Sequence, residues 1–148
     1  MKRRSPIIAA DQRFGRLLKQ AEQSLLRAKS AALKPVGLTL AQYVALTELD
    51  QQPGITAATL ARATLVTPQA MMVLLKTMEE QGLVMRSPHP RHQNVLELRI
   101  TDVGREALHA ARKAVEPVER KVRDAFSNAD IKVMQALLSR LVQAIDAP

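Results

Sequence analysis

The fold is decided by the stretch Thr56–Gly82, which reads TAATLARATLVTPQAMMVLLKTMEEQG. This stretch predicts two helices, residues 57–63 and 67–81, separated by a short turn. Thr67 is a favourable N-cap, and Pro68 follows it at the first helical position, where the missing N–H costs nothing. The glycine that closes the stretch is predicted to end the second helix in a left-handed conformation.

The second helix of this pair separates its apolar positions from the others. Positions three and four apart share one face of a helix, and the apolar stripe formed in this way consists of Met71, Leu74, Leu75 and Met78. The residues off the stripe are Gln69, Met72, Val73, Lys76 and Thr77. We expect Met71 and Leu74 to close one small core with Leu60, Ala61 and Val66, which leaves the other face of the helix open to a partner.

The periodicity after Gly82 changes from helical to roughly alternating. This change predicts strands at Leu83–Arg86 and Val95–Ile100, joined by a loop, while a short extended step at Ile55 precedes the helix pair. A helix pair followed by a hairpin is a winged helix-turn-helix arrangement, in which the first helix braces the second against the DNA major groove. An ordinary helical hairpin is the alternative, and the hairpin directly after the pair favours the winged form.

Two further helices are predicted before the pair. From Asp11 to about Leu33, apolar residues recur at three and four spacing with basic residues between them. Thr39 and Gln42 form a capping-box pattern that opens a second helix, which runs until Pro53. Its inward-facing residues are expected to be Leu40, Tyr43, Val44 and Leu46.

Two more helices are predicted after the hairpin. Thr101 can cap a long helix to about Ala125, which Pro117 is expected to bend or break because proline removes an internal hydrogen bond. Ser127 and Asp130 begin the last helix. Its apolar residues are spaced like a seam that packs against another helix, and they are Ile131, Met134, Leu138, Leu141 and Ile145. The predicted fold class is mainly α with a small β-hairpin wing.

The composition agrees with one domain over residues 1–148. Hydrophobic residues make up 47% of the chain and aromatic residues only 2%, so aliphatic side chains and methionines must fill the core. The formal charge of +8 and the pI near 10.4 favour an anionic partner, either nucleic acid or an anionic membrane. Most of the excess charge lies in Met1–Thr64, whereas Leu65–Gly104 is neutral overall.

Several function classes are excluded by what the sequence lacks. Without cysteine, a disulfide framework, a thiolate zinc site and a cysteine nucleophile are impossible. The histidines lack the carboxylate or cysteine neighbours that metal or hydrolytic chemistry needs, so we expect no enzyme, no cofactor and no metal. The longest apolar run, Ala70–Leu75, is too short for a membrane span, and Ile7–Ala10 is too short for a signal peptide. A cytoplasmic location is expected.

Short motifs follow one another along nearly the whole chain. They are Gly37-Leu38-Thr39-Leu40-Ala41-Gln42, Leu60-Ala61-Arg62, Val66-Thr67-Pro68-Gln69-Ala70-Met71, the run from Met78 to Arg86, Pro88-His89-Pro90, and Leu98-Arg99-Ile100-Thr101 with Gly104. In this order and spacing the chain resembles the multiple antibiotic resistance regulator (MarR) family of winged-helix transcription factors. The resemblance implies a homodimer built from dimerisation helices at 7–36 and 102–148, and a DNA-binding lobe at 39–101.

The function implied by the resemblance is sequence-specific regulation of transcription, as a ligand-responsive repressor on a pseudo-palindromic operator. The wing departs from the family, which commonly has an Asp-Arg-Arg sequence where this chain has His92-Gln93-Asn94. Arg91 is the only cation left at the wing tip, and it either enters the minor groove or touches phosphate alone.

The residues expected to contact DNA lie in the helix pair and the wing. Gln69 can pair with adenine, while Met72 and Val73 can contact thymine methyl groups. Thr67 and Pro68 open the helix. The cations expected at phosphates are Arg62, Arg86 and Arg91, and Lys76 is a further DNA-binding candidate on the second helix.

The family also implies a cleft for a small aromatic or anionic effector between the lobe and the dimerisation helices. Arg16, Tyr43 and Arg112 are candidates for its lining, although Tyr43 alternatively belongs to the core with its hydroxyl at the surface. An effector-independent architectural protein that binds DNA or RNA is the competing function. A membrane-surface role is a more distant one, because the first helix is basic and amphipathic.

Overall fold

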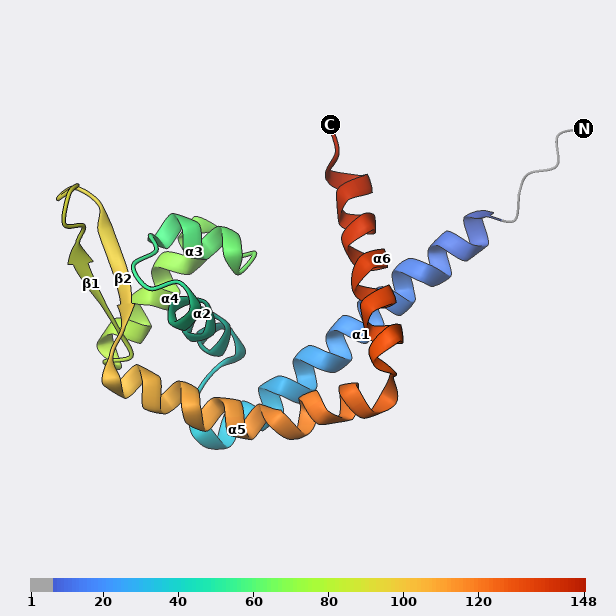
Figure 1. Ribbon diagram of the computed structural model, residues 1–148, viewed down its shortest axis with the longest axis horizontal. Helices are drawn as coiled ribbons and strands as arrows, with labels where there is room; N and C mark the ends of the chain where they lie inside the picture. Colours follow the sequence, from blue (N-terminus) through green and yellow to red (C-terminus); the bar gives the residue numbers. More distant parts are fainter. Residues whose placement is uncertain (1–6) are drawn as a thin grey trace, which may run out of the picture. The chain divides into compact units, whose positions relative to one another are not determined.

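A computed structural model describes residues 7–148, with side chains from Arg13 onward, and it is mainly helical with one two-stranded sheet (Figure 1). The elements in chain order are α1 (Ile7–Leu33), the short 3-10 helix η1 (Lys34–Val36), α2 (Leu40–Gln51), α3 (Ala57–Ala63), α4 (Pro68–Glu80), β1 (Val84–Pro88), β2 (Leu96–Ile100), α5 (Asp102–Ala125) and α6 (Asn128–Asp146). The chain forms two compact units, Met1–Val115 and Glu116–Pro148, with their boundary inside α5.

The helix pair forms as predicted, because each helix has its own side-chain cap. The hydroxyl oxygen of Thr56 accepts from the backbone N–H of Thr59, and that of Thr67 accepts from the N–H of Ala70 at 3.1 Å. Pro68 occupies the first turn of α4, and Gly82 follows the helix with a φ of +71°. The helices α3 and α4 are bent by 110° relative to each other.

The core of the first unit is aliphatic, as the composition predicts. Its fully buried side chains include Leu46 and Leu49 from α2, Leu60 from α3, and Met71 and Leu75 from α4. Of the other residues predicted to face inward, Leu40, Tyr43, Val66 and Leu74 are partly buried and pack against this core, and Val44 is partly buried.

The buried face of α2 is set by a glutamine. Gln42 is 3% exposed, and its Oε1 accepts from the backbone N–H of Thr39 in the predicted capping box. Its Nε2 donates to Oε1 of Gln81 at the end of α4, at 2.8 Å. This side chain therefore points into the unit, and with it Ala45 and Leu49 become the buried positions of α2.

The hairpin is antiparallel, with Val84 opposite Ile100 and Pro88 opposite Leu96. Its first strand continues two residues beyond the predicted end at Arg86. The expected strand at Ile55 is absent from the strands of the described residues. The backbone N–H of Leu98 donates to the O of Ile55, and the N–H of Gly54 donates to the O of Leu98. These two hydrogen bonds connect this segment to β2 but are too few to form a strand.

The long helices differ from the sequence expectations at two points. The helix α1 begins at Ile7 rather than at Asp11. The helix α5 runs without interruption through Pro117, so a break there is wrong. Its start is capped as predicted, since the N–H of Gly104 donates to Oγ1 of Thr101.

The second unit contains the end of α5 and α6. The predicted capping box is present, with Ser127 and Asp130 bonded to each other in both directions. The hydrogen bonds from Ser127 hold the pKa of Asp130 below its usual value, so this cap weakens as the pH falls through that lowered pKa. No residue of α6 is buried, and Met134, Leu138 and Ile145 of the predicted stripe are exposed.

Candidate nucleic-acid interface

The helix α4 presents a solvent-exposed face opposite its buried stripe. Gln69, Met72, Val73 and Lys76 are all exposed, with Val73 at 69%, whereas Met71, Leu75 and Met78 are buried. An apolar valine or methionine in water costs free energy unless another surface covers it. The face is therefore suited to a partner that offers both hydrogen-bonding groups and methyl groups.

The start of α4 adds polar groups to this face. Thr67 is exposed, and its hydroxyl oxygen accepts the capping hydrogen bond, which leaves the hydroxyl proton free to donate outward. Pro68 is exposed beside it. Arg62, at the end of α3, is exposed and donates only to the hydroxyl of Thr59. Each of these groups can reach an anion without losing a buried partner.

The turn between α3 and α4 contains a strained residue that the sequence did not indicate. Leu65 has a φ of +57°, and its side chain is 93% exposed. A left-handed conformation costs an ordinary residue about 1–2 kcal/mol, and here no packing offsets it. The fold tolerates this strain because the neighbouring backbone N–H of Val66 reaches the O of Ala61 and closes α3.

We expect Leu65→Gly to raise the free energy of unfolding by about 0.5–1 kcal/mol, because glycine relieves the strain at some cost in unfolded-state entropy. Denaturant titration followed by circular dichroism measures this change. Leu65→Ala is the matched control, since it removes the side chain but keeps the strain, and its stability should be nearly unchanged. A stabilisation by alanine equal to that by glycine would assign the effect to the exposed side chain.

Arg86 has a structural partner. Its Nε donates to Oε1 of Glu79 at 2.7 Å, and both side chains are about a quarter to a third exposed. This ion pair ties β1 to the end of α4. The contact of Arg86 with phosphate stays a prediction, and the pairing with Glu79 makes it a weaker candidate than the exposed Arg62 or Arg91.

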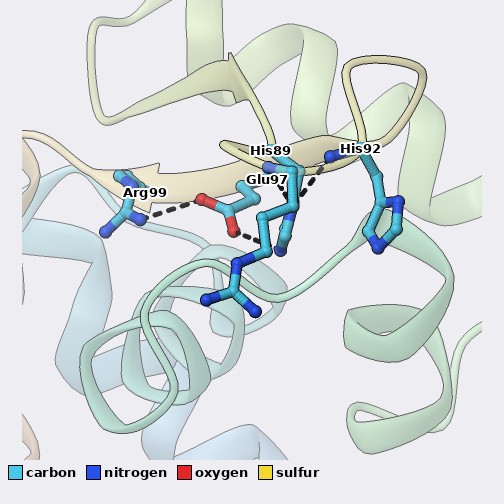
Figure 2. Close-up of polar contacts among 5 residues, drawn as sticks. His89, His92, Glu97 and Arg99 are labelled. Carbon is cyan, nitrogen blue, oxygen red and sulfur yellow. Dashed lines mark hydrogen bonds and ion pairs between the residues drawn. The ribbon is translucent and has the colours of Figure 1, made fainter.

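The wing is organised around a buried carboxylate that the sequence analysis missed. Glu97 is only 8% exposed, and Nη2 of Arg99 lies 2.8 Å from its Oε2. On the other side, Nε2 of His89 lies 3.5 Å from its Oε1 (Figure 2). The expectation that no histidine has a carboxylate neighbour is therefore wrong for His89. The signal was the alternation Leu-Glu-Leu-Arg-Ile in β2, which places Glu97 and Arg99 on one face.

The three residues suggested for a ligand cleft have different settings. Arg16 lines a shallow hollow of about 430 Å³ on α1 with Lys19, Gln20 and Gln23. Tyr43 is half-buried and packs against the core, and Arg112 pairs with Asp50 at 2.8 Å. A separate apolar cavity of about 250 Å³ is lined by Leu26, Leu40, Ala41, Val44, Thr64, Val66 and Leu74.

Within the described part of the chain, no group of three or more histidine, aspartate or glutamate side chains could hold a metal ion. Among those residues, no single helix is long and apolar enough to cross a membrane, and only the bent pair α3–α4 passes that test by length and composition.

Comparison with known proteins agrees with this geometry. A family model described as MarR family matches residues 36–93. The chain is 34% identical to the HTH-type transcriptional repressor Rv2887 of Mycobacterium tuberculosis over 134 residues, which cover 90% of this chain and 96% of that protein.

Solved structures give the same result. The crystal structure of Rv2887 with salicylic acid has a TM-score of 0.67 and 34% identity, and it covers 86% of this chain and 94% of its own. The repressor CouR of Rhodococcus jostii, bound to a 23-mer DNA duplex, has a TM-score of 0.79 and 26% identity, covering 86% of this chain and 91% of its own.

Proposed function

Because this chain belongs to the MarR family of transcriptional regulators, we propose that it is a repressor that binds operator DNA as a homodimer and is released by a small aromatic effector. Residues 39–101 are the DNA-binding lobe, and residues 7–36 and 102–148 supply the dimerisation helices. Regulation of transcription places the protein in the cytoplasm.

The observation that carries the DNA-binding proposal is the exposed face of α4. Gln69 can donate and accept on the edge of adenine, and Met72 and Val73 are placed beside it to meet thymine methyl groups. Lys76, Arg62 and Arg91 are exposed cations that can reach phosphates on either side. The first two turns of α4 carry no charge, so their contacts with base edges would supply sequence preference. The surrounding cations would supply most of the affinity through the phosphates.

The homodimer is supported by the apolar stripe of α6. Met134 and Leu138 are each 40% exposed and Ile145 is 71% exposed, although these residues have the spacing of a helix-packing seam. A second copy of the chain would cover them. The two recognition helices of such a dimer lie about 34 Å apart, one turn of duplex, which requires a pseudo-palindromic operator.

An effector is supported by the two hollows in the first unit. The apolar cavity joins Leu26 of α1 to Leu74 of α4, so a ring bound there would contact the recognition helix directly. The hollow lined by Arg16 and Lys19 is cationic and suits a carboxylate. Rv2887, the relative described above, binds salicylic acid in its crystal structure, and an aromatic acid of this kind is the proposed effector class.

Binding to the DNA upstream of its own gene, with competitor DNA present, tests this function. We expect a footprint of two half-sites, and we expect Gln69→Ala to lose about tenfold in affinity, because each base contact contributes roughly 1–3 kcal/mol. The loss should be confined to sites with one particular base pair. The exposed Thr77→Ala on the same helix is the control. Salicylate is expected to weaken binding by the wild-type protein.

Three outcomes would contradict parts of the proposal. Binding that is insensitive to sequence, or equal for DNA and RNA, would favour an architectural protein without an effector. A Gln69→Ala loss that is uniform across all sites would overturn base reading by this residue. Operator affinity that does not change with millimolar salicylate would remove aromatic acids as the effector class.

A further inference from the structure

The wing loop between β1 and β2 is held by an imidazole. Nδ1 of His89 accepts two backbone hydrogen bonds, from the N–H of Arg91 at 3.0 Å and from the N–H of His92 at 3.2 Å. These bonds tie the two residues after Pro90 back to the ring of His89. The position of the only wing-tip cation, Arg91, therefore follows from a hydrogen bond made by its own backbone.

The protonation of this ring is determined by its partners. A nitrogen that accepts from two N–H groups must carry its lone pair, so the ring proton is on Nε2. Nε2 lies 3.5 Å from Oε1 of Glu97, so a proton on Nε2 is attracted by the carboxylate of Glu97. Glu97 is in turn held by Arg99 and is almost completely buried, so the ring is oriented from the sheet side as well as from the loop side (Figure 2).

We propose that His89 is the positioning residue of the wing, which holds Arg91 in its DNA-contacting place through an unprotonated Nδ1 oriented by Glu97. The inference rests on the proposed DNA-binding function. The loop is thus anchored by an imidazole at its start, and the orientation of that ring depends on the carboxylate of Glu97 from the opposite strand.

Two substitutions at His89 distinguish the contribution of the hydrogen-bond acceptor from that of the aromatic ring. His89→Asn keeps an acceptor, Oδ1, one bond beyond Cγ as Nδ1 is, and it loses the ring. His89→Phe keeps a planar ring of similar size, which can still stack on His92 as the histidine does at 5.2 Å between centroids, and it loses the acceptor. His109→Phe, on the exposed surface of α5, is the matched control.

Operator affinity at pH 8.5 is the first readout, since histidines ordinarily titrate well below that pH. We expect both His89→Phe and Arg91→Ala to lose roughly tenfold in affinity and about one unit of the slope of log affinity against log salt. The double variant with both His89→Phe and Arg91→Ala should lose no more operator affinity than Arg91→Ala alone. His89→Asn and His109→Phe should remain within about twofold of the wild-type protein. Equal losses in the phenylalanine and asparagine variants would overturn the proposal, as would no loss in either.

Amide NMR of the free protein is the second readout, and it needs no DNA. The titratable groups beside the ring are Glu97 and His92, while Arg99 pairs with Glu97 and Arg91 reaches the ring through its backbone N–H. His89→Phe removes the acceptor, so the amide signals of Arg91 and His92 should shift from their wild-type positions at one fixed pH. The same signals should stay near their wild-type positions in His89→Asn, which keeps an acceptor.

The two readouts distinguish a failure of this inference from a failure of the proposed function. A wild-type protein without sequence preference on any DNA would overturn the function and the role of Arg91 together. The amide signals would then still decide whether His89 holds the loop. Sequence-specific binding by the wild-type protein, combined with amide signals that ignore the ring, would overturn the positioning role alone.

Discussion

Leu138→Glu is expected to dissociate the proposed homodimer and to lower operator affinity by at least about a hundredfold, because a single subunit presents only one recognition helix. Leu138 lies in the apolar stripe of α6, a helix in which no residue is buried by its own chain. A carboxylate placed in an apolar helix-packing seam must lose its hydration without gaining a partner. The carboxylate then either takes up a proton or keeps the two subunits apart. Light scattering after gel filtration measures the mass, and a DNA titration measures the affinity.

Gln143→Glu is the matched control for this substitution. It adds the same charge to the same helix, but it lies roughly 140° around the helix axis from Leu138, on the polar side. Its mass and affinity should equal those of the wild-type protein, apart from a small electrostatic effect on DNA binding. Circular dichroism establishes that both variants remain helical. A dimeric Leu138→Glu protein with full operator affinity would show that this stripe is not the interface between subunits.

Gly104→Ala is expected to lower the free energy of unfolding by about 2–4 kcal/mol, because the helix α5 begins in direct contact with the backbone of another segment. A Cβ at Gly104 would lie 2.1 Å from the O of Leu83 and 2.8 Å from Cγ1 of Ile100. The first of these is a backbone atom, which cannot move without shifting the start of the hairpin. The melting temperature, measured by circular dichroism, should fall by about 5–15 °C.

The matched control for this effect is the other helical glycine, Gly15 in α1. A Cβ there would meet no heavy atom within 4 Å, so Gly15→Ala should raise stability by up to about 1 kcal/mol through helix propensity. Stability changes of opposite sign at these two helical glycines would distinguish the cost of a close backbone contact from the gain in helix propensity. Equal effects at both positions would contradict the assignment of Gly104 to a backbone contact.

The features that could be predicted from the sequence are those made by residues close together in the chain. The caps at Thr39, Thr67 and Ser127 are confirmed, since each bonds a backbone N–H three residues away. The separation of α4 into a buried and an exposed face is also confirmed, because helical periodicity alone determines it. These local signals were sufficient for the fold class, the family and the candidate reading face.

The predictions that failed depended on which distant segment a residue meets. The inward face of α2 was only partly predicted. Gln42 was missed because its side chain is satisfied by Gln81, 39 positions away, and a pattern of apolar residues cannot anticipate a buried amide. Similarly, α5 continues through Pro117, because the loss of one hydrogen bond in a long helix does not by itself end it.

The sequence by itself therefore determined the helix pair, its caps, the hairpin that follows it and the exposed face of α4, which is uncharged over its first two turns. Only the tertiary structure decided that Arg86 is engaged by Glu79, that Gly104 touches the backbone of Leu83, and that the wing is anchored by His89 and Glu97. The physical reason is the range of the interactions involved. Caps and periodicity act within a few residues, whereas a buried charge or a close backbone approach exists only once separate segments have packed together.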